Sequence, residues 1–188
     1  MAAGKCSVIS PIKNSGISFV RKWLFFNGKN TDMKHNGELI EVLNDLVRIN
    51  NDRIEGYEKA IRETDESDLE LLTLFNRMID QSQELKAELL EEISQEGGEV
   101  DRDSTTTSGK VYRVWMDVKT ALSGDDRKSV LELCEFGEDA AQKAYERALE
   151  SDATMGADVR LLIKNQKADL KSSHDEVRNA RDMQVRIK

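Results

Sequence analysis

The 188-residue chain has a formal net charge of −8, and 34% of its residues are charged while only 5% are aromatic. This length suffices for one domain with a sizeable core, and the composition is typical of long helices with wide solvated faces. Two cysteines argue against a disulfide framework and favour a reducing, cytoplasmic compartment. An acidic surface repels nucleic acid and anionic membranes, so we expect neither as a stable partner.

Residues 1–32 differ from the rest of the chain, with five basic residues against one acidic residue, Asp32. Their apolar run at 17–26 is too short and too interrupted by charge to span a bilayer. No small-residue cleavage site follows it cleanly, which disfavours a secretory signal. A basic membrane-surface segment and a disordered tail remain open. The favoured interpretation is a basic, aromatic extension upstream of a true start at Met33.

The remaining residues, 33–188, contain no proline, so long helices without kinks are permitted. The first helix is predicted from about Asn36, a plausible cap, to Arg62. One buried face is indicated by residues that recur at spacings of three and four: Leu39, Leu43, Leu46, Asn50, Ile54, Tyr57 and Ile61.

A second helix is predicted to begin at Ser67, because Ser67 and Glu70 have the spacing of a capping box. Gly97-Gly98 is expected to end it through a left-handed C-terminal cap. The connection to the first helix is short, so the two helices should form an antiparallel hairpin. The inward stripe of the second helix is Leu71, Phe75, Met78, Ser82, Leu85, Leu89 and Ile93.

Residues 99–110 are rich in Ser, Thr, Asp and Gly and predict a loop, which a short amphipathic helix follows at 111–122. Two more long helices are predicted at about 126–150 and 157–182. Their inward stripes are Val130, Cys134, Gly137, Ala141, Ala144 and Ala148, and then Val159, Ile163, Gln166, Leu170, Ser173/His174 and Val177. Two antiparallel hairpins joined by a long crossover predict an all-α, ferritin-like four-helix bundle over residues 33–188.

All four stripes turn polar or small about halfway along. The predicted mid-bundle layer consists of Asn50, Ser82, Gly137, Ser173 and His174. A polar layer at this level is where helical bundles build metal or cofactor sites. The alternative is that these groups satisfy one another, since a fully bonded polar layer can specify one arrangement of helices.

A ferritin-like di-iron site needs a Glu from two helices and a Glu-x-x-His from each of the other two. The chain has two histidines, of which His35 precedes the first helix and His174 has Lys171 where the carboxylate is needed. Both paired motifs are therefore broken, and no catalytic set is predicted. A looser site for a divalent metal, iron or manganese, would draw on His174, Glu138, Glu135, Glu55 and Asp52.

Several motifs resemble one known family. They are Cys134-Glu135-Phe136-Gly137-Glu138-Asp139-Ala140-Ala141 with Ala144-Tyr145, Trp115-Met116-Asp117-Val118-Lys119, Leu43-Asn44-Asp45-Leu46 with Gly56-Tyr57, and His174-Asp175. In this order and spacing the chain resembles an uncharacterised bacterial family of ferritin-like four-helix bundles, the domain of unknown function 2383. The resemblance implies a ferritin-like fold and no established activity.

The sequence favours a non-enzymatic, cytoplasmic bundle that acts through homo-oligomer assembly or a protein partner. A stress-related role is suggested only by analogy with ferritin-like proteins. One alternative is a metal-binding protein, oxidase or peroxidase with a non-standard site. Another is a bundle that binds a small molecule beside Gly137. Cys134 lies on an inward stripe, where a thiol is usually inert.

Overall fold

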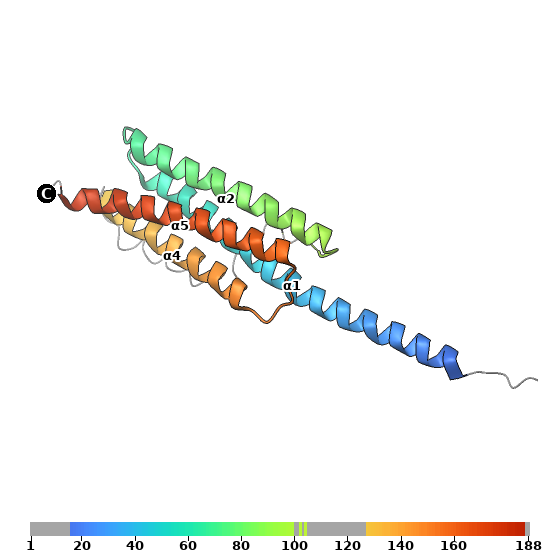
Figure 1. Ribbon diagram of the computed structural model, residues 1–188. Coiled ribbons are helices and arrows are strands. Elements are labelled where there is room, and N and C mark those ends of the chain that lie inside the picture. The colour runs from blue at the N-terminus through green and yellow to red at the C-terminus, as the bar shows by residue number, and fades with distance from the viewer. Residues whose placement is uncertain (1–15, 100–101, 103, 105–126, 187–188) are drawn as a thin grey trace, which may run out of the picture. The chain divides into compact units, whose positions relative to one another are not determined.

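The structure is a computed structural model that describes residues 16–99, 102, 104 and 127–186, with side chains described from Asn36 to Gln184 within these ranges. Four helices and no strand occur in this described part of the chain: α1 (Gly16–Glu63), α2 (Leu69–Gln95), α4 (Arg127–Glu150) and α5 (Ala157–Arg186) (Figure 1). The predicted all-α, four-helix architecture is therefore confirmed. None of the described helices is long and apolar enough to cross a membrane.

The chain divides into two units, Met1–Lys34 and His35–Lys188. Helix α1 begins at Gly16, so the predicted start at Asn36 is wrong. The residues before Asn36 are already helical, so Asn36 lies inside α1, where its side-chain amide donates to the backbone oxygen of Glu96 at 2.7 Å. No proline interrupts the helix between Gly16 and Glu63.

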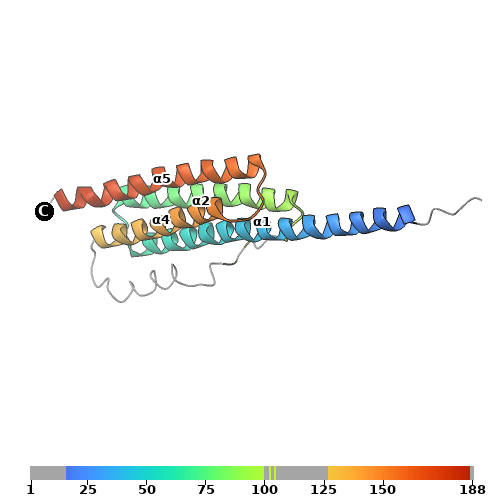
Figure 2. The ribbon, with the colours of Figure 1, turned by 60° about the horizontal axis from the view of Figure 1, so that its bottom comes forward.

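In the unit His35–Lys188, α1 and α2 form the first predicted antiparallel hairpin, and the four helices lie lengthwise beside one another (Figure 2). The predicted cap at Ser67 is wrong by one residue. Asp68 caps α2 by accepting a hydrogen bond from the Leu71 backbone N–H at 3.2 Å, whereas Ser67 bonds to Asp65.

The C-terminal end of α2 has the predicted glycine cap. Gly97 adopts a left-handed φ of 72°, a conformation that costs glycine little because it has no Cβ. The backbone N–H of Gly97 donates to Ser94, and that of Gly98 donates to Ile93. These two bonds form a Schellman motif, which satisfies carbonyls at the helix end.

The second predicted hairpin consists of α4 and α5. Their observed bounds match the predicted 126–150 closely and extend the predicted 157–182 to Arg186. The predicted short helix at 111–122 lies outside the described residues. Along the outside of the hairpin, acidic residues of α4 pair with basic residues of α5: Glu135 with Arg181, Asp139 with His174, and Glu146 with Lys167.

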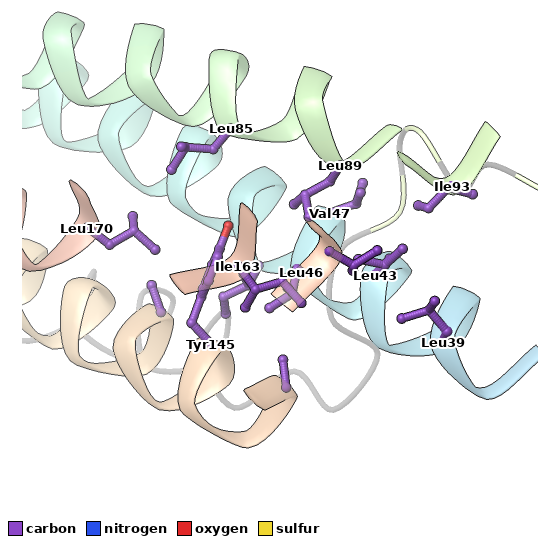
Figure 3. Packing of buried hydrophobic residues seen from close by; sticks show 14 residues of the cluster. Leu39, Leu43, Leu46, Val47, Leu85, Leu89, Ile93, Tyr145, Ile163 and Leu170 are labelled. Atoms are coloured by element: carbon purple, nitrogen blue, oxygen red, sulfur yellow. The ribbon is translucent and has the colours of Figure 1, made fainter. Parts of the chain in front are cut away.

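The core consists of two apolar clusters rather than one. The larger cluster, shown in Figure 3, comprises Leu39, Leu43, Leu46, Val47, Ile49, Leu85, Leu89, Ile93, Ala141, Tyr145, Ala148, Val159, Ile163 and Leu170. The smaller comprises Tyr57, Ala60, Leu71, Leu74, Phe75, Met78, Val130, Leu131, Cys134 and Val177. Each fully buried large side chain contributes about 1.5–3 kcal/mol. The level between the clusters is occupied by polar side chains.

Candidate functional site

Buried polar side chains from all four described helices lie between the two apolar clusters. They include Asn50, Arg53, Ser82, Glu138, Gln166 and Ser173, each 5% exposed or less. We call this set, with Tyr57, Gln81 and Tyr145 that bond to it, the mid-bundle layer. Buried polar groups are costly unless they are hydrogen-bonded, so their partners decide what the layer does.

The centre of the mid-bundle layer is an ion pair between Arg53 of α1 and Glu138 of α4. Glu138 Oε1 accepts from Arg53 Nη2 at 2.6 Å and from Arg53 Nε at 3.2 Å. The Tyr57 hydroxyl donates to the same oxygen at 2.5 Å. The side chains of Arg53 and Glu138 are 2% and 0% exposed, so the pair is excluded from solvent.

Further hydrogen bonds of the Arg53 guanidinium extend this network to α2 and, through Gln81, to α5. Nη1 donates to Ser82 Oγ at 2.8 Å, and Nη2 also donates to Gln81 Oε1 at 3.2 Å. The Ser173 hydroxyl of α5 donates to the same Gln81 oxygen at 2.7 Å. The Arg53 guanidinium of α1 thus bonds directly to α2 and α4, and Gln81 connects it to Ser173 of α5.

A second buried network lies toward the larger apolar cluster. The Asn50 amide donates to the Tyr145 hydroxyl at 2.8 Å, and that hydroxyl donates to Gln166 Oε1 at 2.8 Å. The Gln166 amide then donates to the Leu85 carbonyl at 3.1 Å and to Glu88 Oε2 at 2.8 Å. Together the two networks account for most buried polar groups at this level.

The pKa values of three residues in the layer, Arg53, Tyr57 and Tyr145, are raised. Burial, the largest single effect, lowers the pKa of Arg53, but the charge and hydrogen bonds of Glu138, together with Tyr57 and Tyr145, outweigh it and the net pKa is raised. Burial, reinforced by the negative charge of Glu138, holds the pKa of Tyr57 well above its usual value. Burial likewise raises the pKa of Tyr145. Both tyrosines therefore remain neutral hydrogen-bond donors, and the Arg53 guanidinium remains charged.

Two acceptor atoms of the layer have no hydrogen-bond partner among the described residues: Asn50 Oδ1 and Glu138 Oε2. Both are buried and both can only accept. Such atoms are uncommon in folded proteins, because an unmade hydrogen bond costs about 1–3 kcal/mol. Every other buried side-chain nitrogen or oxygen of the layer has a hydrogen-bond partner within the described part of the chain.

The residues predicted for the polar layer differ in where the structure places them. Asn50, Ser82 and Ser173 lie in the networks, and Gly137 is buried beside Glu138 on α4. His174 lies at the edge of the α4–α5 contact instead. Its ring nitrogens face Asp139 Oδ1 at 3.1 Å and Asp175 Oδ1 at 3.2 Å.

The candidate metal ligands are not brought together. Glu138 is held by Arg53, Glu135 pairs with Arg181, and Glu55 is exposed, whereas Asp52 is a buried residue of α1. Within the described ranges no three His, Cys, Asp or Glu side chains form a group that could hold a metal ion.

Sequence reasoning missed Arg53 and Tyr145, although both carry the networks. Arg53 follows Asn50 by three residues and precedes Tyr57 by four, so its helical spacing placed it on the inward face. Tyr145 follows Glu138 by seven residues, which is two helical turns. The i, i+3, i+4, i+7 rule would have found Arg53 if a charged residue had been allowed on the inward face. In α4 the predicted stripe used Ala144, which is only half-buried, whereas its neighbour Tyr145 is buried.

The fold and this layer define a four-helix bundle with a buried polar centre. The chain belongs to the family described as a domain of unknown function (DUF2383), whose sequence model matches residues 38–151. The match covers most of the bundle, including Arg53, Tyr57 and Glu138. A comparison with curated proteins found no match.

Proposed function

We propose that this protein is a non-enzymatic, ferritin-like bundle of the cytoplasm that acts through self-assembly or partner binding. The observation that supports the proposal is the ion pair between Arg53 and Glu138 at mid-bundle. In ferritin-like di-iron proteins, glutamates at this level face inward and hold metal ions. Here a guanidinium lies against the buried glutamate of α4 and supplies the positive charge.

The surroundings of the ion pair favour a structural role over a catalytic one. A carboxylate that binds metal or transfers a proton needs an oxygen that substrate or solvent can reach. Glu138 is fully buried, and its Oε1 already accepts three hydrogen bonds from Arg53 and Tyr57. Because this site is buried, we expect the protein to contact other molecules through the exposed faces of its helices.

Metal content tests the proposal against the main alternative, a metal-binding protein, oxidase or peroxidase with a non-standard site. The full chain is expressed with added iron and manganese, purified without chelator and measured by elemental analysis. We expect substoichiometric metal in the wild type. Stoichiometric iron or manganese that is lost in His174→Ala or Glu138→Gln, and kept in the exposed control Glu84→Gln, would contradict the proposal.

The unpaired oxygens Asn50 Oδ1 and Glu138 Oε2 favour a second candidate function, the binding of a small hydrogen-bond donor. Native mass spectrometry of the full chain tests it. A retained mass that disappears in Asn50→Leu and persists in the exposed control Asn165→Ala would support this candidate over the first.

A further inference from the structure

The face of α4 that points away from the core contains an exposed aromatic side chain. Phe136 is 44% exposed, with half-buried Leu133 one turn before it and half-buried Ala140 one turn after it. The spacing of three and four residues places Glu132, Phe136, Ala140, Lys143 and Arg147 along one side of the helix. We call these five residues the outer α4 face.

Within the described part of the chain, no ion pair joins the outer α4 face to another helix. The acids on the side toward α5 have partners there, as Glu135 with Arg181 and Glu146 with Lys167. By contrast, Glu132 pairs with Lys128 one turn away on the same helix at 3.2 Å. An exposed pair of this kind is worth about 0–1 kcal/mol and is easily exchanged.

The order of residues along the outer α4 face is self-complementary. Glu132 lies before Phe136, and the two cations, Lys143 and Arg147, lie after Ala140. If two copies of this face met in parallel, each charge would lie beside its own copy and repel it. If they met antiparallel about a twofold axis at Ala140, the acid at one end would meet the base at the other end.

We propose that the outer α4 face is a homodimer interface in which the α4 helices of two copies pack antiparallel across Ala140. Glu132 then faces Arg147 of the second copy, and Phe136 lies against the stem of Lys143 of the second copy. The small side chain of Ala140 allows the two helices to approach closely at the axis. An ammonium beside an aromatic ring adds a cation–π attraction.

The proposed interface is small, because it uses one face of one helix. Interfaces at the low end of the size range are typical of weak and transient association. The inference rests on the proposed function, since it names the surface through which self-assembly would occur. The partner at the outer α4 face is a second copy of this chain, because the charges of the two halves of this face are complementary to each other.

Sedimentation equilibrium of the full chain over a wide concentration range tests the interface. We expect a reversible dimer of the 21.3 kDa chain. Glu132→Lys and Arg147→Glu each place like charges opposite one another and should weaken dimerisation by about tenfold or more. Combining the two reversals restores opposite charges and should restore the wild-type dissociation constant. Phe136→Ser should also weaken the dimer.

The matched control is Leu161→Ser, which removes another exposed apolar side chain, 57% exposed, from α5. It should leave the dimerisation constant unchanged. Because the altered side chains are exposed, thermal melts monitored by circular dichroism should match the wild type and exclude misfolding.

Two outcomes would overturn the interface. A wild-type chain that is monomeric at every concentration contradicts it, as does an oligomer that none of the α4 variants weakens. In the second case assembly stands and only this surface is wrong. The proposed function fails separately, through stoichiometric metal in the purified protein.

Discussion

Arg53 and Glu138 are 85 residues apart in the chain, and their side chains meet at the centre of the bundle with 2.6 Å between Nη2 and Oε1. One residue comes from the first hairpin and the other from the second. The pair therefore couples the two hairpins at the level where the apolar core is interrupted. Its burial makes its contribution to folding sensitive to the loss of either partner.

Glu138→Gln removes the negative charge and leaves the Arg53 guanidinium buried without a counter-ion. The free energy of unfolding should fall by about 3–5 kcal/mol, the usual consequence of breaking a buried ion pair. Urea denaturation followed by circular dichroism measures the change. The control Glu135→Gln affects a partly exposed pair with Arg181 and should cost about 0–1 kcal/mol.

The same ion pair allows a complementary test, in which both partners are replaced by apolar residues. Arg53→Met combined with Glu138→Leu should recover most of the stability lost in Glu138→Gln, because no buried charge remains. A double variant as unstable as the single one would contradict the assignment of the loss to an unpaired charge.

Tyr145→Phe removes a hydroxyl that accepts from Asn50 and donates to Gln166. Both side chains are buried, so the change should lower the free energy of unfolding by about 1–3 kcal/mol. A double-mutant cycle with Asn50→Ala should show that the two effects are not additive. Additive losses would mean that the Asn50–Tyr145 hydrogen bond contributes nothing. The exposed Asn165→Ala provides the baseline.

Gly97→Ala forces a Cβ into a left-handed backbone with a φ of 72° and should destabilise the protein by about 1–2 kcal/mol. Gly156→Ala is the matched control, since Gly156 is outside the left-handed region and a Cβ there would meet nothing within 4 Å. Thermal melts should shift for the first variant alone. Equal melting temperatures for both variants would be inconsistent with a strained cap at Gly97.

Cys134 should make the protein less stable in alkaline solution. Burial, with a further contribution from Glu138, raises the pKa of its thiol well above the usual value. Because the folded state holds this proton more tightly, the stabilisation is complete below the unfolded pKa of about 8.5 and is lost as the pH rises above it. In a Cys6→Ser background, urea midpoints measured from pH 7 to pH 10 should fall.

The control for the alkaline loss is Cys134→Ala in the same background. It should be less stable at pH 7 because it leaves a small cavity, yet its midpoint should fall less steeply between pH 8.5 and pH 9.5. An unchanged slope would show that other groups, Tyr57 among them, cause the loss.

The inward stripe of α2 illustrates how much the sequence could predict. All seven predicted positions, from Leu71 to Ile93, are buried, and Leu74 joins them. The 3.6-residue period and the hydrophobic effect fix such a face without reference to the rest of the molecule. The prediction failed at the start of α1, because the helix continues upstream of Asn36 to Gly16 and a cap-type residue does not by itself end a helix.

The amino-acid sequence by itself determined the four long helices, most of their inward positions and the presence of a polar level halfway along, because these depend on spacing along one chain. Only the tertiary structure decided what that level contains. It turned Arg53 inward to meet Glu138 and placed His174 at the edge, between Asp139 and Asp175. The physical reason is that a buried charge must pair with a group that a neighbouring helix brings within hydrogen-bond distance. The spacing of residues along one helix does not specify which group that is.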